Sequence, residues 1–371
     1  MTRDGHHPGA AGGDIGMWER AQFLTQQGHT VTVVASRFPG AARSEVIDGI
    51  QVVRLGGILS LWLRTFWYYI RHCRNRFDAA VVEGFGGSRI PRFAPLYVKE
   101  PVITEWHQIH KALFEAQYPG LLVAPLTLLE RVTAFIHRDT IVVARTDEWR
   151  EAFPQLGFRR ENVVVVPACI GEDWLREGRA GQVTEPRIVW LGRFLQYKCP
   201  DHVIQAMPQI IRQVPDAQLV LAGRHTDRTY EQKLVELIRR LDLERHVTFH
   251  FDLTDAEKRD LLRSCRVMAL PSSVEGFGIV VLEANACGVP VVASSGVPAG
   301  AVRHGRNGLR YPFGDQAALA AGLIEILTDE ASYRRLSASS LASAGEFGFA
   351  EVCGRYEKVI RDAVAARMAT V

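Results

Sequence analysis

Residues 267–293 read VMALPSSVEGFGIVVLEANACGVPVVA, and this stretch decides the fold. Its two ends, 267–270 and 289–293, are short apolar runs rich in β-branched residues, as expected of strands buried on both faces of a parallel sheet. A glycine-containing loop lies between them, followed by a segment that begins a helix near Gly278. Strand, loop, helix and strand in this order are typical of an α/β domain.

The same alternation extends through most of the chain. In the N-terminal half, strands are expected at 30–35, 50–55, 79–82, 102–104, 140–143 and 163–166. A second set follows at 187–191, 218–222, 247–251, 267–270 and 289–293. Helical segments lie between them, such as 17–27, which places Met17, Ala21 and Leu24 on one face and stops at Gly28. The pattern predicts two doubly wound α/β halves.

The alternation breaks at 169–186, which is polar, glycine-containing and aperiodic, so we expect the interdomain linker there. This divides the chain into an N-terminal domain at 1–168, a C-terminal domain at 187–345 and a final segment at 346–371 that contains an amphipathic helix. Two such halves would leave a cleft between them. Because open α/β sheets bind ligands at the carboxyl ends of their strands, the site should lie in loops that follow strands.

The start of the chain departs from this plan. A doubly wound domain ordinarily begins with a buried strand before its first glycine turn, but only residues 1–11, mostly polar or small, precede Gly12 and Gly13. We therefore expect either that this domain lacks its first strand or that the reading frame begins upstream of Met1.

Composition narrows the function classes. The 44 basic residues nearly balance the 41 acidic ones, giving a net charge of +3, so the basic excess typical of a nucleic-acid binder is missing. The six cysteines form no CxxC pair, which favours reduced thiols and a cytoplasmic protein over a disulfide framework or a zinc site. No run of about 18 apolar residues predicts a membrane-spanning helix, and residues 1–13 do not resemble a signal peptide.

Glu275 and Glu283 flank the predicted start of the helix near Gly278. The first N–H groups of a helix lack internal partners and attract phosphate, and Gly276 and Gly278 let a ligand approach the backbone closely. Two carboxylates beside an anion site suit hydroxyl groups on either side of a diphosphate, a sugar at one end and a ribose at the other. The alternative is that both glutamates are solvated surface charges.

Gly192, Arg193 and Lys198 follow the strand at 187–191. Two cations on one loop suit a departing diphosphate, since it is already a good leaving group and mainly needs its charge stabilised. The alternative is an exposed basic loop. The chain contains no DxD motif, so we expect these cations, and no metal or other cofactor, to hold the diphosphate.

Three further features are weaker signals. His107 follows the strand at 102–104 and is a candidate for contact with the sugar, with His110 a lesser one, although a lone histidine is more often structural. Gly13, in the Gly12-Gly13 pair, is a candidate for backbone contact with a phosphate or an acceptor. Residues 61–76 are aromatic and basic, which suits a membrane surface or an apolar acceptor, or else a packed helix with a basic face.

Together these segments resemble glycosyltransferase family 4, the large group of retaining GT-B enzymes. The match is strongest from Arg187 to about Gly314 and includes GRFLQYK, QLVLAG, VTFHFDLTDAEKRDLL, LPSSVEGFGIVVLEANACGVPVVAS and HGRNGLRYPFGD. The N-terminal half matches more loosely, through GGDIGMWERAQFLTQQGHTVTVV, PVITEWHQIH and LERVTAFIHRDTIVV. The resemblance implies two Rossmann-like domains facing each other across a cleft, with the last helix crossing back to the N-terminal domain.

The resemblance also implies a role for each candidate residue. Arg193 and Lys198 would bind the donor diphosphate, Glu275 the hydroxyls of the transferred sugar, and Glu283 the ribose. His107 would lie near the donor sugar and Gly13 on the phosphate side. Backbone groups near the helix start would touch sugar and phosphate, those of Phe277, Gly278, Ile279 and Val280.

Three segments depart from the family pattern. The usual Pro-Asn-Gly-Val-Asp reads PACIG at 167–171, the glycine that commonly follows the lysine is Cys199, and the usual Gly-Gly-(Ile/Val)-Pro-Glu reads SGVPA at 295–299. The arginine, the lysine and the paired glutamates all remain.

The expected function is therefore retaining, metal-independent transfer of a sugar from a nucleotide-diphosphate sugar to an acceptor hydroxyl. The aromatic stretch favours an apolar or lipid-linked acceptor and peripheral contact with the inner face of the membrane. A sugar-nucleotide epimerase or hydrolase, and a non-catalytic nucleotide-sugar-binding partner, remain as alternatives. A nicotinamide dehydrogenase is disfavoured, because no GxGxxG follows a strand with an acidic residue about twenty positions later.

Overall fold

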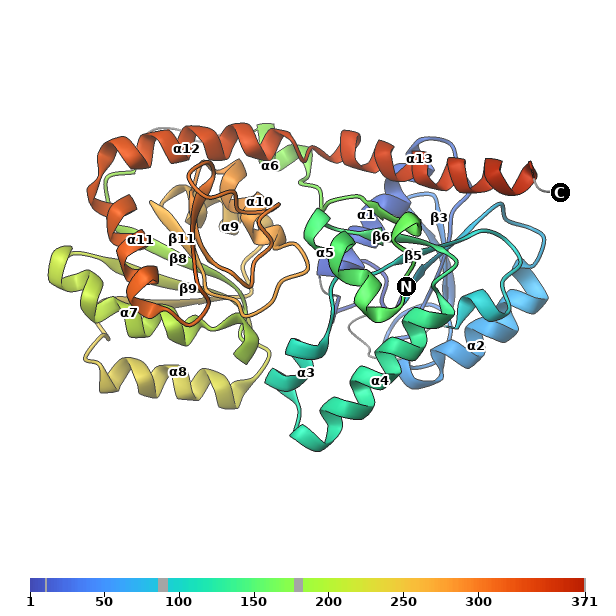
Figure 1. The fold of residues 1–371 in the computed structure, drawn as a ribbon, viewed down its shortest axis with the longest axis horizontal. Helices are drawn as coiled ribbons and strands as arrows, with labels where there is room; N and C mark the ends of the chain where they lie inside the picture. The colour runs from blue at the N-terminus through green and yellow to red at the C-terminus, as the bar shows by residue number, and fades with distance from the viewer. Residues whose placement is uncertain (11, 86–92, 177–182, 370–371) are drawn as a thin grey trace. The chain divides into compact units, whose positions relative to one another are not determined.

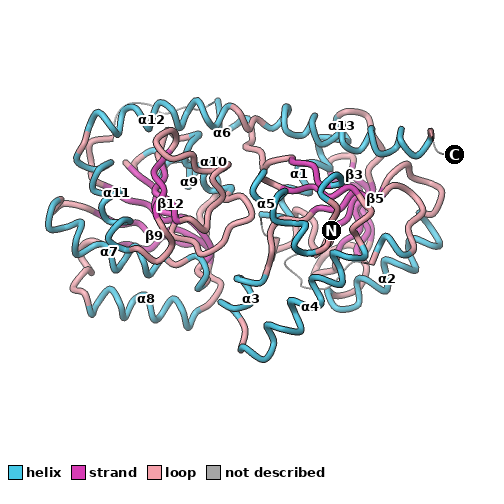
Figure 2. The backbone as a smooth tube through the Cα atoms, in the orientation of Figure 1, coloured by secondary structure: helices cyan, strands magenta, loops and turns pink. Residues whose placement is uncertain are grey.

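The computed structural model describes residues 1–10, 12–85, 93–176 and 183–369. It divides into two compact units: unit 1 comprises Met1–Phe114, Pro119–Cys169 and Phe349–Val371, and unit 2 comprises Glu115–Tyr118 and Ile170–Gly348. Each is an α/β structure built around parallel strands (Figures 1 and 2). The expectation of two α/β halves is thus confirmed.

Unit 1 contains two sheets. In the first, β1 (Thr32–Ala35) pairs parallel with β3 (Ile50–Arg54), which pairs antiparallel with β2 (Ser44–Ile47), a strand that the sequence did not predict. The second is fully parallel, in the order β4-β5-β6-β7. Its strands are β4 (Ala80–Glu83), β5 (Val102–Glu105), β6 (Ile141–Ala144) and β7 (Val163–Val165).

The helices of unit 1 cover these sheets. Trp18 and Ala21 of α1 pack against β1 and β3, while Phe23 packs with residues of β5, β6 and α13. The last helix therefore belongs to the core of unit 1. The helical elements that lie wholly or partly in unit 1 are α1 (Gly12–Gln26), α2 (Leu61–Tyr68), a π-helical turn (Tyr69–Cys73), α3 (Lys111–Gln117), α4 (Gly120–Ile136), α5 (Asp147–Ala152) and α13 (Phe349–Met368).

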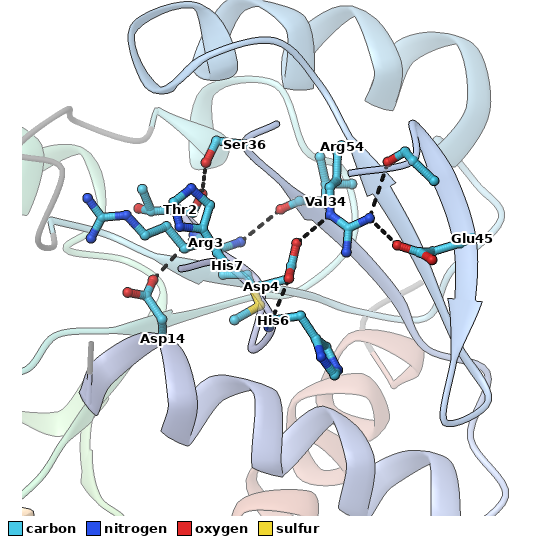
Figure 3. Close-up of polar contacts among 12 residues, drawn as sticks. Thr2, Arg3, Asp4, His6, His7, Asp14, Val34, Ser36, Glu45 and Arg54 are labelled. Carbon is cyan, nitrogen blue, oxygen red and sulfur yellow. Dashed lines mark hydrogen bonds and ion pairs between the residues drawn. The ribbon is translucent and has the colours of Figure 1, made fainter. Parts of the chain in front are cut away.

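The predicted helix at 17–27 begins earlier than expected. α1 starts at Gly12, so Gly12 and Gly13 form its first turn and do not precede it, as the sequence had suggested. Among the described residues no strand precedes α1. Instead, the Met1 amino group donates to the Val34 carbonyl in β1 (3.1 Å), and just beyond β1 the Ser36 hydroxyl donates to the Thr2 carbonyl (2.7 Å), as Figure 3 shows. Ser36 N donates to the same carbonyl (3.0 Å).

Unit 2 is one six-stranded parallel sheet in the order β10-β9-β8-β11-β12-β13. Numbered along the chain within this unit, that order is 3-2-1-4-5-6, the doubly wound arrangement in which the connections reverse direction between the first and fourth strands. The strands are β8 (Arg187–Arg193), β9 (Gln218–Arg224), β10 (Val247–Phe251), β11 (Val267–Leu270), β12 (Val291–Ser294) and β13 (Gly308–Tyr311).

Helices cover both faces of this sheet. Figure 1 shows α7 and α8 below it and α9, α10 and α12 above it. The helices are α6 (Glu172–Arg176), α7 (Pro200–Gln213), α8 (Arg228–Arg240), α9 (Asp255–Arg263), α10 (Ile279–Ala286), α11 (Gln316–Thr328) and α12 (Glu330–Gly345). The segment expected to be an aperiodic linker thus contains a short helix, α6, because Trp174 buries its side chain in unit 2 beside Lys258 and Arg259.

Candidate functional site

The candidate residues of unit 2 lie at the point where the strand order reverses. β8 and β11 are neighbours at the centre of the sheet, and they run parallel. β8 ends with Gly192 and Arg193, and the loop after β11 carries Glu275. In open α/β sheets this switch point is where ligands bind, because the helices after the two strands lie on opposite faces and leave a crevice.

Lys198 and Glu275 meet at this crevice. Lys198 ends a short 3₁₀ turn (Gln196–Lys198), and its Nζ lies 2.5 Å from Oε1 of Glu275. The same carboxylate oxygen accepts a hydrogen bond from Ser272 Oγ (2.7 Å). Only 15% of the lysine side chain and 8% of the glutamate side chain are exposed, so the pair is well shielded from water. A small polar ligand would meet a fixed cation and a fixed carboxylate together.

Arg193 is exposed and donates from Nη2 to the hydroxyl of Tyr197 (3.0 Å). Tyr197 itself is buried, so its hydroxyl holds the guanidinium in place while the arginine stays exposed to solvent. A guanidinium kept in this way remains available to an anion, which it binds through a planar fork of N–H donors.

The backbone of the loop turns sharply before α10. Gly278 caps the helix with φ +94°, a left-handed conformation that residues with a β-carbon rarely adopt. Gly276 and Phe277 precede it, and Phe277 is buried with its ring against Phe347. The next N–H groups, those of Ile279 and Val280, lie in the first turn of α10, where backbone donors are free of intrahelical partners.

Glu283, one turn further along α10, pairs with a lysine that the sequence analysis missed. Lys258 of α9 places Nζ 3.1 Å from Oε1 of Glu283 and 2.6 Å from Oδ1 of Asp255. Burial raises the pKa of Glu283, although Lys258 partly opposes the rise. The only signal in the sequence was the spacing Asp255-x-x-Lys258 at the start of a predicted helix, which is too common to single out.

In unit 1, Gly13 and His107 lie against each other. His107 follows β5, and a β-carbon built on Gly13 would come within 3.0 Å of its Nε2. Arg145 Nε donates to His107 Nδ1 (3.3 Å), and because arginine only donates, the ring proton of a neutral His107 lies on Nε2. Nε2 is buried and has no hydrogen-bond partner among the described residues, so it is an N–H donor free for a ligand.

A buried charge network supports His107. Burial by itself would raise the pKa of Glu105, but Arg145 and Arg20 lower it to about 2. Burial lowers the pKa of Arg145 to about 10, and burial followed by Arg145 lowers that of His107 to about 4, so its ring is neutral at pH 7. The sequence analysis missed Arg20, Glu105 and Arg145. Arg145 directly follows β6, so its strand-end position was the available signal.

The other two N-terminal candidates have different surroundings. His110 is buried and its Nδ1 lies 2.6 Å from Oε1 of Glu130, which gives it a structural partner. Residues 61–73 form α2 and the π-helical turn, with Trp62, Leu63 and Trp67 exposed, and residues 74–76 form the turn that follows. The segment 61–76 also contains four exposed arginines for which the described part of the chain shows no ion pair, namely Arg64, Arg71, Arg74 and Arg76.

The described residues contain neither a metal-binding cluster nor a membrane-spanning helix. No group of His, Cys, Asp and Glu side chains there is arranged to hold a metal ion. None of the described helices is both long enough and apolar enough to cross a membrane.

Comparison with known proteins identifies the class. Residues 175–341 match the family described as "Glycosyl transferases group 1", and residues 14–169 match the "Glycosyl transferase 4-like domain". The chain therefore belongs to the family 4-like glycosyltransferases, whose fold is GT-B, and the resemblance seen in its motifs is confirmed.

Individual relatives agree with this assignment. A D-inositol 3-phosphate glycosyltransferase from Kineococcus radiotolerans is 31% identical over 253 residues, covering 62% of this chain and 58% of the relative. The chain thus spans less than two thirds of that protein's length. Sucrose-phosphate synthase from Thermosynechococcus elongatus has a similar fold, with TM-score 0.80, 20% identity, and 96% and 94% of the two chains covered. Anabaena HepE in complex with UDP and glucose is also similar, with TM-score 0.77 and 18% identity, and the match covers 95% of this chain and 96% of that one.

Proposed function

We propose that this protein transfers a sugar from a nucleoside-diphosphate sugar to an acceptor hydroxyl, with retention at the anomeric carbon and without a metal ion. The observation that carries the proposal is the switch point of unit 2, where Arg193, Lys198 and Glu275 meet a helix start. The binding of UDP and glucose by a protein of the same fold supports a nucleotide-sugar donor.

The chemistry follows from these groups. Arg193 and Lys198 offset the charge that develops on the diphosphate as its bond to the anomeric carbon breaks. Glu275 accepts hydrogen bonds from sugar hydroxyls, and Glu283 does so from the ribose. We assign to His107 a contact with the transferred sugar, donated from its neutral Nε2–H.

Retention requires the acceptor hydroxyl to attack the face that the diphosphate leaves. A bond forms between the acceptor oxygen and the anomeric carbon, the bond to the phosphate oxygen breaks, and the hydroxyl proton passes to a donor phosphate oxygen. Proton NMR of the first product formed from an α-linked donor tests this assignment. An α-linked product supports retention, whereas a β-linked product would refute it.

The positively charged side chains at the switch point support transfer without a metal ion. Arg193 and Lys198 supply two positive charges at the place where a divalent cation would otherwise bridge phosphate oxygens. Transfer should therefore survive excess EDTA. A loss of turnover that Mg²⁺ or Mn²⁺ restores would contradict this part of the proposal.

Binding of the donor is tested first by thermal stabilisation with UDP, GDP, ADP and dTDP. A ligand at 100 times its Kd adds about 2.7 kcal/mol to the unfolding free energy, which shifts the melting temperature visibly. One nucleotide should stabilise the wild type and stabilise Glu283→Ala less. If none stabilises the wild type, the proposed function fails.

We further propose that residues 61–76 make peripheral contact with a membrane, on the cytoplasmic side. Exposed Trp62 and Trp67 suit the interface between headgroups and acyl chains, and Arg71 and Arg74 suit anionic headgroups. Free thiols on all six cysteines agree with a reducing compartment. Sedimentation with anionic vesicles should be lost in Trp62→Ala/Trp67→Ala, and equal binding by this variant would refute the contact.

A further inference from the structure

Unit 1 contains a hollow that no role described so far uses. Its volume is about 570 Å³, within the range of sites that bind small molecules. Most of its wall is apolar, and the charged or ring-nitrogen side chains in it are those of His7 and Arg37. The lining residues are His7, Pro8, Arg37, Phe38, Pro39, Gly57, Ile58 and Ser60. We call this hollow the Phe38 pocket.

The aromatic wall of the Phe38 pocket is held in place before any ligand arrives. The His7 ring meets the Phe38 ring edge-on, with centroids 4.9 Å apart. The guanidinium carbon of Arg54 lies 5.1 Å from the centroid of the same ring, and Arg54 is itself fixed by a 2.7 Å ion pair with Asp4 (Figure 3). A ring clamped in this way offers a preformed apolar surface, which lowers the ordering entropy of binding.

The polar side of the Phe38 pocket is positive. Arg37 is exposed, and the described residues show no ion pair to its guanidinium. Nδ1 of His7 accepts from Gly9 N (2.9 Å), which leaves Nε2 as an N–H donor. Asp4, the nearby carboxylate, is already engaged by Arg54. An anionic group on the ligand would therefore find a cation and a neutral donor, and none of the described residues that line the pocket is a carboxylate.

The Phe38 pocket lies at the carboxyl end of the first sheet of unit 1. Its residues follow the carboxyl ends of β1 and β3, which are parallel. Thr2 ties that edge to the second sheet, since Ser36 N after β1 donates to the Thr2 carbonyl and Thr2 Oγ1 donates to Glu83 Oε2 at the end of β4 (2.6 Å). His107 follows the neighbouring strand, β5. The pocket thus lies at the carboxyl end of the first sheet of unit 1 and His107 at that of the second, and Thr2 contacts both sheets.

We propose that the Phe38 pocket binds the acceptor, and that the acceptor is a small molecule in which an apolar ring carries both the reacting hydroxyl and an anionic group. This deepens the proposed function and rests on it. The apolar part packs on Phe38 and Ile58, and the anionic group faces Arg37. An acceptor that is polar all round would leave the apolar wall uncovered.

Binding of three probes, measured calorimetrically without donor, tests the proposal. 6-Hydroxynaphthalene-2-sulfonate has the ring, hydroxyl and anion, 2-naphthol lacks the anion, and myo-inositol 1-phosphate lacks the apolar ring. The sulfonate should bind best. Phe38→Ala and Ile58→Asp should each weaken it about tenfold or more, since roughly 1.4 kcal/mol of apolar contact corresponds to tenfold. Circular dichroism checks that both variants fold.

The charge is tested by a matched pair of arginines from the same connection between β1 and β2. Arg37→Gln should weaken the sulfonate and leave 2-naphthol unchanged, whereas Arg43→Gln, outside the pocket, should change neither. Equal sulfonate binding by the wild type, Phe38→Ala and Ile58→Asp would overturn the proposal, as would tighter binding of the inositol phosphate. Stabilisation by nucleoside diphosphates is measured on the same variants. Its absence in the wild type refutes the proposed function, and its retention in variants that lose probe binding shows that the pocket is separate from the donor site, as an acceptor pocket must be.

Discussion

The α-carbon of Gly13 faces the free nitrogen of His107 so closely that a β-carbon there would lie 3.0 Å from Nε2. Contacts this short force the ring to move, and the ring is held from its other side by Arg145. The glycine is therefore needed for the space next to His107, because its helical position in α1 does not require one.

Gly13→Ala should lower kcat/KM because the added β-carbon displaces the His107 ring, by less than the roughly 10²-fold that a shift of about 1 Å costs. Gly16→Ala is the matched control, since it lies one turn along the same helix and its β-carbon would meet the Arg20 guanidinium at ordinary distances, 3.6 Å to Nη1 and 3.9 Å to Nη2. This control should keep its activity and gain about 0.5–1 kcal/mol of unfolding free energy from helix propensity. Equal activity of the two variants would show that the space beside His107 is not used.

Arg193→Ala should lower the rate of transfer roughly 10²–10³-fold, the loss typical of one preorganised donor to a developing anion. Because Arg193 is exposed, the melting temperature should stay within about 2 °C of the wild type, as for most surface substitutions. Tyr197→Phe removes only the hydroxyl that holds the guanidinium and should have a smaller effect in the same direction. Near-wild-type turnover of Arg193→Ala would remove it from the site.

Lys198 and Glu275 should be energetically coupled, since their charged atoms lie 2.5 Å apart and are shielded from water. Lys198→Met and Glu275→Leu should each destabilise the protein, and the double variant should be less destabilised than the sum by roughly 1–3 kcal/mol. Calorimetric unfolding measures the cycle. As a control, Lys358→Met removes a lysine that pairs with Asp362 on the exposed surface of α13. Its effect on the unfolding free energy should simply add to that of Glu275→Leu. Additivity of the first pair would mean that the ion pair does not form.

Acid should destabilise the protein through His107 before it does so through Glu105. The folded pKa of His107, about 4, lies below its ordinary 6.5, so the unfolded chain binds more protons and stability falls as the pH drops from 6.5 to 4. For Glu105 the same sign applies between 4.5 and about 2. The melting temperature of the wild type should be lower at pH 5 than at pH 7. This difference should be smaller in His107→Gln and unchanged in His250→Gln, whose histidine is exposed. An unchanged difference in His107→Gln would contradict the lowered pKa.

The fold followed from the sequence to a large extent, while parts of the candidate site did not. The runs at 187–191 and 247–251 were apolar and β-branched, so their strands were predicted within a few residues of their ends. Strand β2 was not predicted, because its sequence SEVI is largely exposed and contains no continuous apolar run. The start of α1 was predicted too late, because glycine is a poor helix former and Gly12 and Gly13 were expected to precede the helix. Core contacts of Trp18 and Ala21 stabilise the helix so that it includes both glycines.

The apolar runs alone placed Arg193, Lys198 and Glu275 at the carboxyl ends of strands in a parallel sheet, although Arg193 is the last residue of β8 and not part of the loop that follows it. Only the tertiary structure decided that β8 lies beside β11, that Lys198 meets Glu275, and that Gly13 makes room for His107. The physical reason is that periodicity and glycine positions record each segment's local preferences. Which strands pair, and which side chains then meet, depends on burying all the apolar faces together.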